Sequence, residues 1–422
     1  TQLRDNFKQA INNARNVLNK TKGQNLDFEA VDALKDAISE TKDSLNGIER
    51  LKAAKLKADK FIEGLNHINK AQLTHALKDV ASTDSLTKLS RLINKSMNLD
   101  DAMNALKDSL INNAAPVQAS SNYINADNDL KNQFDEALNN ARKALAKSTG
   151  KDLDENQVDG LKQAIIDTKD ALNGEERLAK SKAKAQEYVQ TLSNLNNAQR
   201  KVAENSITNS EDLNSLAESI SKVTELNKAM EDLHNALISN ATPVHASVNY
   251  INADEDLQNQ FDQALQQARN TLSKATGKPA SIEEVQGLIQ SIKDTKEALN
   301  GDQRLAKAKF KAEIFINQLK DLNNAQRVDS IKQANDTDNL KDLSQIVSTA
   351  SDLNNSMSEL KAKLKETVNP VKSSINYINA DYDLKRQFNK AIKDAREALS
   401  KTKGANLNER DIQGLSLSLI HI

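Results

Sequence analysis

Tyr123-Ile-Asn-Ala-Asp127 occurs again as Tyr250-Ile-Asn-Ala-Asp254 and as Tyr377-Ile-Asn-Ala-Asp381, with a step of 127 residues each time. Markers of other residue types keep the same step: a Phe (Phe7, Phe134, Phe261, Phe388), a Gly (Gly23, Gly150, Gly277, Gly404), a Pro (Pro116, Pro243, Pro370) and the Gly of a Leu-Asn-Gly triplet (Gly47, Gly174, Gly301). Because unrelated markers share one register, the chain is a tandem repeat of roughly three and a third copies.

The composition predicts an all-α chain. Of 422 residues, 38% are hydrophobic and 28% are charged, with only 11 Gly and 4 Pro. Few helix breakers and much Ala, Leu, Lys and Glu favour helices. The chain has no Cys, which excludes disulfides, Cys-ligated metals and a thiol nucleophile.

Charge and hydropathy exclude two classes of partner. Lys and Arg number 58 against 59 Asp and Glu, so a net charge of −1 gives no support for binding to nucleic acid. No apolar run approaches the roughly 20 residues that span a membrane, so we expect no direct membrane insertion. No export or anchoring signal is recognisable, so any such signal lies outside this sequence or does not exist.

The larger part of each repeat predicts three amphipathic helices. From Asp127, apolar residues at Leu130, Phe134, Leu138, Ala141 and Leu145 form one helical stripe. Asp127 or Asp129 is the expected N-cap, and Gly150 the expected glycine after the helix end. A second stripe follows Asp154 and ends at Asn173-Gly174, and a third helix runs from Leu178 to Leu195. Together they predict an antiparallel three-helix bundle of about 75 residues.

The smaller part of each repeat, from Asn197 to Pro243, predicts a second three-helix bundle of about 47 residues. Its last apolar stripe changes phase near Ser221–Thr224, which we interpret as a break between two helices. The fold class is therefore all-α: a tandem array of three-helix bundles, two per 127-residue repeat, forming an elongated monomeric rod. The predicted boundaries are 1–68, 116–195, 243–322 and 370–415 for the larger bundles, and 69–115, 196–242 and 323–369 for the smaller ones.

The last copy is expected to be frayed, because it is too short to complete a bundle with those boundaries. Residues 416–422 lose the charged pattern of the earlier copies, and we expect them to be a vector-derived or read-through tail.

The repeat resembles a known pair of modules. Tyr-Ile-Asn-Ala-Asp, the following Leu/Phe/Leu/Ala stripe, Leu-Asn-Gly and a nearby Arg-Leu (Arg177-Leu178) resemble a FIVAR module. Leu195-Asn-Asn-Ala-Gln-Arg200 and a last helix centred on Met103, Met230 or Met357 resemble a GA module. Their alternation on a 127-residue step is similar to the repeat region of the giant extracellular-matrix-binding proteins of staphylococci.

The resemblance, and not the periodicity, implies a function. Members of that family are exported, cell-wall-associated proteins linked to fibronectin binding, attachment and biofilm growth, so fibronectin is the expected partner and the location is extracellular. GA modules elsewhere bind serum albumin, which makes albumin a second possible partner. The alternative is a purely structural spacer that braces the cell envelope.

Candidate chemistry is weak by comparison. The five histidines, His67, His75, His234, His245 and His421, share no register, whereas a repeated metal or catalytic site would repeat its ligands. Acid pairs such as Glu175-Glu176 fit helix starts. Lys147-Ser-Thr-Gly-Lys151 lacks the order of a nucleotide-binding loop. We therefore expect no enzymatic activity, no cofactor, and no catalytic, cofactor-binding or metal-binding residue, and the sequence assigns no ligand-binding residue.

The repeated tyrosines Tyr123, Tyr250 and Tyr377 leave two alternatives. Each lies shortly after a proline, at the predicted joint between repeats, where it would pack the linker and fix the angle between neighbours. An amphipathic aromatic at a joint would also suit a contact with a partner.

Overall fold

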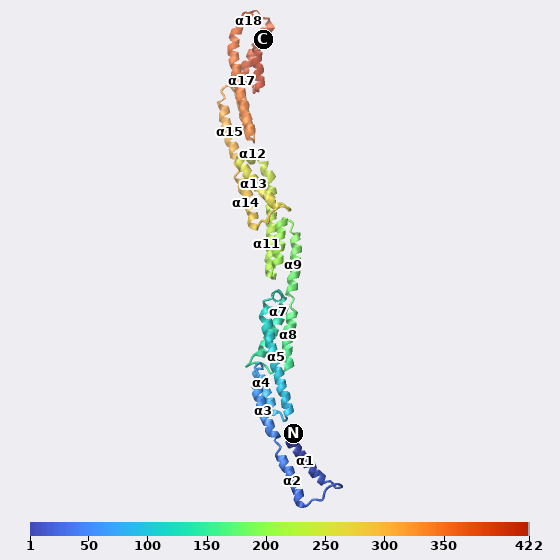
Figure 1. Cartoon of the computed structure of the whole chain (residues 1–422). Coiled ribbons are helices and arrows are strands. Elements are labelled where there is room, and N and C mark those ends of the chain that lie inside the picture. The colour runs from blue at the N-terminus through green and yellow to red at the C-terminus, as the bar shows by residue number, and fades with distance from the viewer. Residues whose placement is uncertain (421–422) are drawn as a thin grey trace. The chain divides into compact units, whose positions relative to one another are not determined.

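The computed structural model describes residues 1–420, and all regular structure in that range is α-helical (Figure 1). The predicted fold class is confirmed in its all-α content and its three-helix bundles. The helices form two compact units. One holds Thr1–Lys184 with Ser210–Leu216, and the other holds Ala185–Asn209 with the residues from Ala217 on.

The helices repeat with the sequence. The chain begins with α1 (Gln2–Val17), α2 (Phe28–Asp43), α3 (Gly47–Glu63), α4 (Lys70–Ser82), α5 (Leu86–Gln118), α6 (Ser121–Ile124), α7 (Asn128–Leu145) and α8 (Glu155–Asp170). The next copy contains α9 (Gly174–Thr191), α10 (Asn197–Asn209), α11 (Leu213–His245), α12 (Val248–Ile251), α13 (Glu255–Leu272) and α14 (Ile282–Glu297). The last helices are α15 (Gly301–Gln318), α16 (Asn324–Asp336), α17 (Leu340–Lys372), α18 (Ile375–Asn379), α19 (Tyr382–Leu399) and α20 (Glu409–Ser418).

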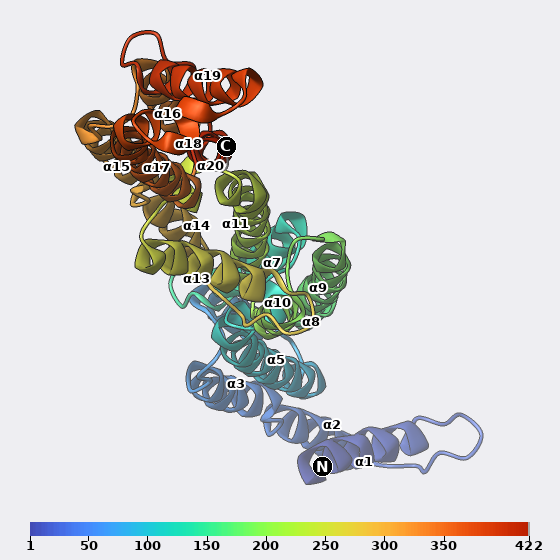
Figure 2. The ribbon, with the colours of Figure 1, turned by 90° about the horizontal axis from the view of Figure 1, so that it is seen from above.

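Two kinds of three-helix bundle alternate along the first unit. In the smaller kind, α3 and α4 pack against the first half of α5 around buried Ala58, Ile62, Val80 and Leu89. In the larger kind, the second half of α5 packs with α7 and α8 around buried Phe134, Leu138, Val158 and Ile165. The preceding helices α1 and α2 form a hairpin joined by residues 18–27 (Figure 2).

One 33-residue helix serves both bundles. Leu89, near the start of α5, belongs to the core of the smaller bundle, and Met103 and Leu106 belong to the core of the larger one. Leu99 lies between them and packs against both cores. The same arrangement recurs in α17, where Leu343, Met357 and Leu360 belong to a single continuous core.

The predicted break near Ser221–Thr224 is wrong, because α11 is continuous from Leu213 to His245. The equivalent helix α5 passes from the core of one bundle into the core of the next, so a different side of it becomes buried, and the same change accounts for the phase slip in α11. The helix also runs through Pro243 and ends at His245, so Asn240–Pro243 is not a closing loop. Pro116 and Pro370 likewise lie inside α5 and α17.

The predicted boundaries 116–195 and 196–242, and their equivalents in the other copies, are corrected accordingly. The helix that we assigned as third in the larger bundle belongs to the smaller one, since α3 packs on α4 and α5, and α15 packs on α16 and α17. The missing third helix of the larger bundle is the second half of α5 or α17. Met103, assigned to the smaller bundle, lies in the core of the larger one beside Phe134.

The last copy completes a bundle, contrary to the expected fraying. The second half of α17 packs with α19 and α20, and Phe388, Ile412 and Leu419 are buried in the shared core. Of the expected tail 416–422, Ser416 and Leu419 are buried, while His421 and Ile422 lie outside the described residues.

Candidate functional site

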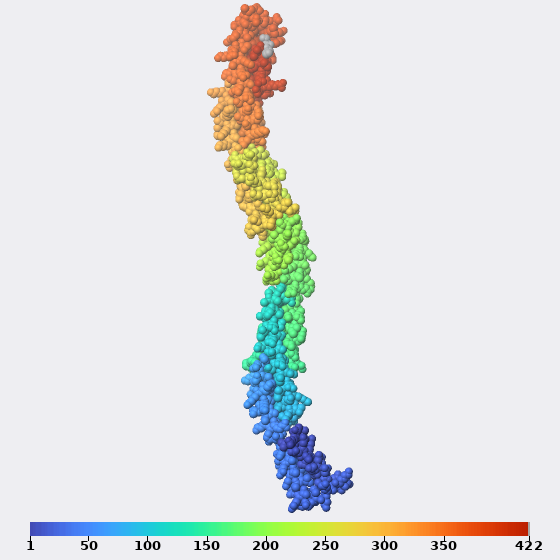
Figure 3. All heavy atoms as spheres, in the orientation of Figure 1, coloured from blue at the N-terminus to red at the C-terminus, as the bar shows by residue number. Residues whose placement is uncertain are grey.

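The two units offer little that resembles an enzyme site. The face of each unit drawn in Figure 3 carries no deep cleft. Within residues 1–420, no three His, Asp or Glu side chains converge as metal ligands would. Among the same residues, no helix is both long and apolar enough to cross a membrane.

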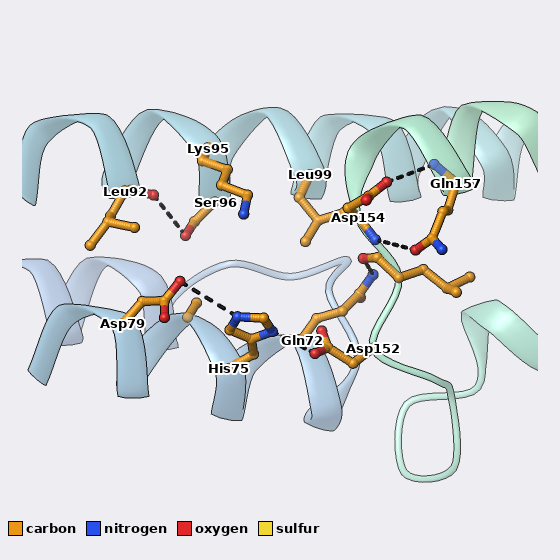
Figure 4. A pocket seen from close by; sticks show the side chains of 12 residues that line it. Gln72, His75, Asp79, Leu92, Lys95, Ser96, Leu99, Asp152, Asp154 and Gln157 are labelled. Carbon is orange, nitrogen blue, oxygen red and sulfur yellow. Dashed lines mark hydrogen bonds and ion pairs between the residues drawn. The ribbon is translucent and has the colours of Figure 1, made fainter. Parts of the chain in front are cut away.

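A hollow of about 220 Å³ lies in the first unit between α4, α5 and the start of α8 (Figure 4). His75 lies on its floor, with Nδ1 2.5 Å from the Asp152 carboxylate and Nε2 3.5 Å from that of Asp79. The ring therefore connects α4 to the loop before α8. Its place on the 127-residue step is taken by Val202 and Asp329, so this arrangement occurs in one copy.

Two other histidines also pair with carboxylates. His67 Nδ1 lies 2.9 Å from Asp100, and His245 Nε2 lies 2.6 Å from Asp262. Asp100 is buried, which works against ionisation. Hydrogen bonds from the His67 ring and from the backbone N–H groups of His67 and Ile68 outweigh that effect and lower the pKa of Asp100.

The role of Asp100 is structural, because asparagine performs it in the other copies. Asn227 accepts from the backbone N–H of Asn194, and Asn354 accepts from that of Asp321, as Asp100 accepts from His67. His234 is exposed on α11. The structure thus brings no repeated catalytic group around a histidine in the described residues.

The contacts that do repeat lie at the joints between bundles. The first is an Asn–Gln clamp, formed by the N-cap Asn of α4, α10 or α16 and the Gln three residues later (Asn69 and Gln72; Asn196 and Gln199; Asn323 and Gln326). These side chains are almost fully buried. Asn323 and Gln326 exchange capping-box hydrogen bonds of 2.9 and 3.1 Å, which satisfy two free N–H groups at the helix start.

The clamp also crosses to the next bundle. Asn323 Nδ2 donates to the carbonyls of Ala398 and Ala405, at 3.1 and 2.9 Å, and Gln326 Nε2 donates to Leu407 at 2.9 Å. The other copies repeat this pattern, with Asn69 bound to Ala144 and Lys151, and Asn196 bound to Thr271 and Lys278. The side-chain amide of the clamp Asn therefore caps a helix through its oxygen and holds the loop of the next bundle through its nitrogen.

The loop that faces the clamp contains the Lys147-Ser-Thr-Gly-Lys151 stretch. Lys147 donates to the carbonyls of Asn66 and Ile68, and the backbone N–H of Lys70 donates to Lys147. Gly150 does not have the positive φ of a C-terminal glycine cap. It is required because a Cβ there would lie 2.6 Å from Asn69 Nδ2. This loop is part of a joint between bundles.

The second repeated contact is the Asn-Gly joint, between the Tyr-Ile-Asn-Ala-Asp segment and the Leu-Asn-Gly triplet of the same repeat. Asn173 Oδ1 accepts from the backbone N–H of Asp127 at 3.1 Å, and Asn173 Nδ2 donates to the Asp127 carboxylate at 2.7 Å. Arg177 adds an ion pair with Asp127 at 3.1 Å and donates to the carbonyl of Asn125. Asn300, Asp254, Arg304 and Asn252 repeat these contacts.

The Tyr-Ile-Asn-Ala-Asp segment also contacts the start of the next long helix, α11 or α17. Asn125 Oδ1 accepts from the backbone N–H of Leu213 at 2.8 Å, and Asn252 Oδ1 accepts from that of Leu340 at 2.8 Å. Asn125 and Asn252 therefore add a cap from outside to α11 and α17, beside the local capping residues Asp212 and Asn339.

The repeated tyrosines pack inside the larger bundle. The hydroxyl of Tyr123 donates to Asp135 at 2.7 Å, and its ring lies edge-on to Phe134 with centroids 6.0 Å apart. Tyr250 does the same with Asp262 and Phe261, at 2.8 Å and 6.0 Å. This geometry favours packing over a partner contact, since each ring holds the segment after the long helix against α7 or α13.

Burial, and then the hydrogen bond and charge of Asp262, raise the pKa of Tyr250 to about 12. An unfolded tyrosine titrates near 10. The folded state therefore holds this proton more tightly, and its contribution to stability is present below pH 10 and lost as pH rises toward 12. In an ultraviolet titration of phenolate, we expect Tyr250→Phe to remove the component that ionises last and Asp262→Asn to move it to lower pH. An unchanged curve for Asp262→Asn would contradict the assignment.

Large apolar side chains also remain exposed at repeated positions. The Ile of Tyr-Ile-Asn-Ala-Asp is about half exposed in every copy: Ile124 at 48%, Ile251 at 47% and Ile378 at 58%. An aromatic residue on the first helix of each smaller bundle is similarly open: Phe61 at 44%, Tyr188 at 38% and Phe315 at 40%. We call these two positions the repeated apolar surface. Packing in a buried core does not account for a large apolar residue at either of them.

Comparison with known proteins identifies the modules. The FIVAR domain profile matches residues 1–46, 102–173, 229–300 and 356–415, more than half of the chain. The chain belongs to the FIVAR domain family. The GA module profile matches the intervening residues 48–102, 175–229 and 302–356. FIVAR and GA modules thus alternate in tandem, and where a GA match passes into a FIVAR match, at residues 102, 229 and 356, the junction lies inside a 33-residue helix.

The curated relatives are named extracellular matrix-binding proteins and come from Staphylococcus aureus. The chain is 36% identical over 408 residues to "Extracellular matrix-binding protein ebh" of Staphylococcus aureus strain MW2, covering 97% of this chain and 4% of that protein. It is equally similar to "Extracellular matrix-binding protein EbhA" of strain Newman, of which it covers 12%. The chain therefore spans a small part of the length of these curated relatives.

A solved structure shares the fold. The crystal structure of EbhA (756–1003 domain) from Staphylococcus aureus is 28% identical to this chain. It matches with a TM-score of 0.54 over 58% of this chain and 98% of the solved one.

Sequence analysis missed the Asn–Gln clamp and the Asn-Gly joint as contacts between bundles. The signal was present, since Asn-x-x-Gln recurs at Asn69, Asn196 and Asn323, and Leu-Asn-Gly recurs on the same step. Periodicity shows that a residue is retained, but it does not show that its partner lies about 50 or 80 residues further along.

Proposed function

We propose that this chain is a segment of a non-enzymatic bacterial surface protein that binds host extracellular matrix, with fibronectin as the partner. It supports attachment and biofilm growth from a position outside the cell, held at the cell wall. The similarity to proteins named extracellular matrix-binding protein, over 97% of this chain, is the observation that carries the proposal.

The repeated apolar surface supports a multivalent mechanism. Each repeat presents the same exposed isoleucine and the same exposed aromatic, so a weak contact made by one repeat is available to all of them. Linked weak contacts gain about 10²–10⁴ in apparent affinity when several can engage at once. In this proposal several repeats of one chain engage matrix-bound fibronectin together, so the chain prefers it to the soluble protein.

The test compares proteins with one, two and three repeats on immobilised fibronectin, cut so that every shared long helix stays whole. We expect dissociation to slow by at least about tenfold with each added repeat. The triple variant Ile124→Ser, Ile251→Ser and Ile378→Ser is expected to lose most of this gain and keep its helix content. Affinity that does not change with repeat number would contradict the mechanism.

A second candidate is a purely structural spacer, and the joints between bundles are the observation that favours it. Shared helices, the Asn–Gln clamp and the Asn-Gly joint connect neighbouring modules without a flexible linker. A spacer predicts a fully folded chain with no fibronectin binding at any surface density. Binding to serum albumin in solution would instead indicate that the GA modules carry the activity.

A further inference from the structure

We propose that Asn46, Asn173 and Asn300 are sites of spontaneous deamidation, and that the Asn-Gly joint controls the rate at each of them. Asn-Gly occurs at these three positions alone in the sequence, always in Leu-Asn-Gly. A closed joint protects Asn173 and Asn300, whereas no Tyr-Ile-Asn-Ala-Asp segment faces Asn46 within residues 1–420.

The chemistry needs only water. The backbone nitrogen of the glycine attacks Cγ of the asparagine side chain, a new C–N bond forms, and the side-chain amide leaves as ammonia. Water then opens the resulting five-membered imide to aspartate or isoaspartate, and nothing is oxidised or reduced. Asn-Gly reacts most readily because glycine has no Cβ to hinder the approach of its nitrogen.

The joint holds the side chain away from that path. Both polar atoms of the Asn173 amide are bound to Asp127, at 3.1 and 2.7 Å, and the Asn173 carbonyl accepts from the backbone N–H of Arg177 at 3.0 Å. Cγ can reach the nitrogen of Gly174 only after both side-chain bonds break. Asn300 is held in the same way by Asp254, at 3.1 and 2.7 Å.

The product does not fit the closed joint. Aspartate at position 173 replaces the donor Nδ2 by a second carboxylate oxygen, which then faces the Asp127 carboxylate and repels it. Isoaspartate inserts an extra backbone atom beside Gly174, where even a Cβ would lie 2.2 Å from the carbonyl oxygen of Asn122. Deamidation and a closed joint therefore exclude each other.

Asn46 is an internal control in this chain, because the position 127 residues before Asp127 precedes Thr1. It is exposed, it caps α3 without a side-chain hydrogen bond, and a Cβ at Gly47 would meet no atom within 4 Å. Its triplet Leu-Asn-Gly is the same as that of the other two copies. Any difference in rate between Asn46 and Asn173 therefore reports the joint and not the local sequence.

The consequence is that deamidated product accumulates at a joint in proportion to the time that the joint has been open. Each opening exposes Asn173 or Asn300 to an irreversible reaction, and the new carboxylate then prevents the joint from closing again. Along an array of repeats, the modified fraction at each Asn-Gly pair measures how often that joint has been open.

The experiment uses the whole chain, incubated in mildly alkaline buffer and sampled over weeks, with peptide mass spectrometry at the three sites. We expect Asn46 to deamidate at least about tenfold faster than Asn173 and Asn300. The reason is that Asn173 and Asn300 can react only while their joints are open. Asp127→Ala is expected to accelerate Asn173 and leave Asn300 unchanged, and Asp254→Ala to do the reverse. Asp127 makes no side-chain cap bond to its own helix, so its removal tests the joint.

Each variant carries its own reference, because the untouched joint stays in the same molecule. If a variant lost helix content by circular dichroism, the rates at the three sites in the unaltered chain would still decide the question. Equal rates at Asn46, Asn173 and Asn300 in the unaltered chain would overturn the proposal. An Asp127→Ala variant that accelerates deamidation at both Asn173 and Asn300, or at neither of them, would also overturn it.

Discussion

Replacing Gly301 by alanine is expected to destabilise the second unit by about 3 kcal/mol. A Cβ at this position would lie 2.0 Å from the carbonyl oxygen of Asn249 and 2.7 Å from the backbone nitrogen of Ala253. Both atoms belong to backbone, which cannot turn aside as a flexible side chain does. The new methyl group must therefore push the Tyr-Ile-Asn-Ala-Asp segment away from α15 and open the Asn-Gly joint.

Two matched substitutions separate this clash from the general effect of removing a glycine. Gly287 lies inside α14 with no atom within 4 Å of its would-be Cβ, so Gly287→Ala is expected to stabilise the unit by about 0.5–1 kcal/mol. Gly47 has the same Leu-Asn-Gly context and equally open space, and Gly47→Ala should be nearly neutral or slightly stabilising. Urea unfolding followed by circular dichroism, with hydrogen exchange at α15, measures all three. If Gly301→Ala behaved like Gly287→Ala, the close approach would be wrong.

Replacing Asn323 by alanine is expected to cost about 3 kcal/mol, which exceeds the loss of a helix cap. Losing an N-cap costs about 1 kcal/mol. Here the substitution also removes the donor to the carbonyl of Ala398, which is buried, and to that of Ala405, whose hydrogen bond is partly buried. Each unsatisfied buried group adds about 1–3 kcal/mol, and some relaxation of the loop recovers part of that loss.

Two further variants separate the cap from the clamp. Ser281 caps α14 through a capping box but makes no contact across a joint, so Ser281→Ala should show the cap loss alone, about 1 kcal/mol. Asn323→Asp retains the cap acceptor and replaces the donor Nδ2 by an oxygen, so it should be at least as harmful as alanine. Thermal and urea unfolding compare them. Equal costs for Asn323→Ala and Ser281→Ala would show that the clamp adds nothing.

These two predictions concern the same property of the chain, the coupling of a module to its neighbour. A GA module in this protein shares a long helix with the following FIVAR module, and Asn125 and Asn252 add a hydrogen bond to the starts of the long helices α11 and α17. We therefore expect a substitution at a joint to lower the protection of backbone amides in both flanking modules. Hydrogen exchange measures that protection residue by residue.

The periodicity of single helices was sufficient to predict most of the secondary structure. The stripe Leu130, Phe134, Leu138 and Ala141 forms the core-facing side of α7, and Asp154 is the N-cap of α8. These features depend on residues within a few turns of one another, so local physics fixes them. The prediction failed where one helix changes partners, because a phase slip within α11 has the same appearance as two helices in a sequence.

The candidate sites also divide into features that the sequence predicts and features that depend on tertiary packing. The absence of a repeated histidine or cysteine constellation could be read from the chain alone. The contacts of each retained residue could not be read from the sequence. Gly150 is predicted to be a glycine cap after a helix end, and it instead leaves room for Asn69. Lys147 lies in a stretch that does not match a nucleotide-binding loop, and only the structure shows that it binds the carbonyls of Asn66 and Ile68.

By itself, the sequence determined the repeat length, the helical class and the residues that one copy must keep, because helix-forming patterns and retained markers are properties of the chain. Tertiary structure alone decided where one module ends and the next begins, and which asparagine closes which joint. Those features depend on hydrogen bonds between groups separated by 46 to 88 residues, and only packing brings such groups to 2.8–3.1 Å from each other.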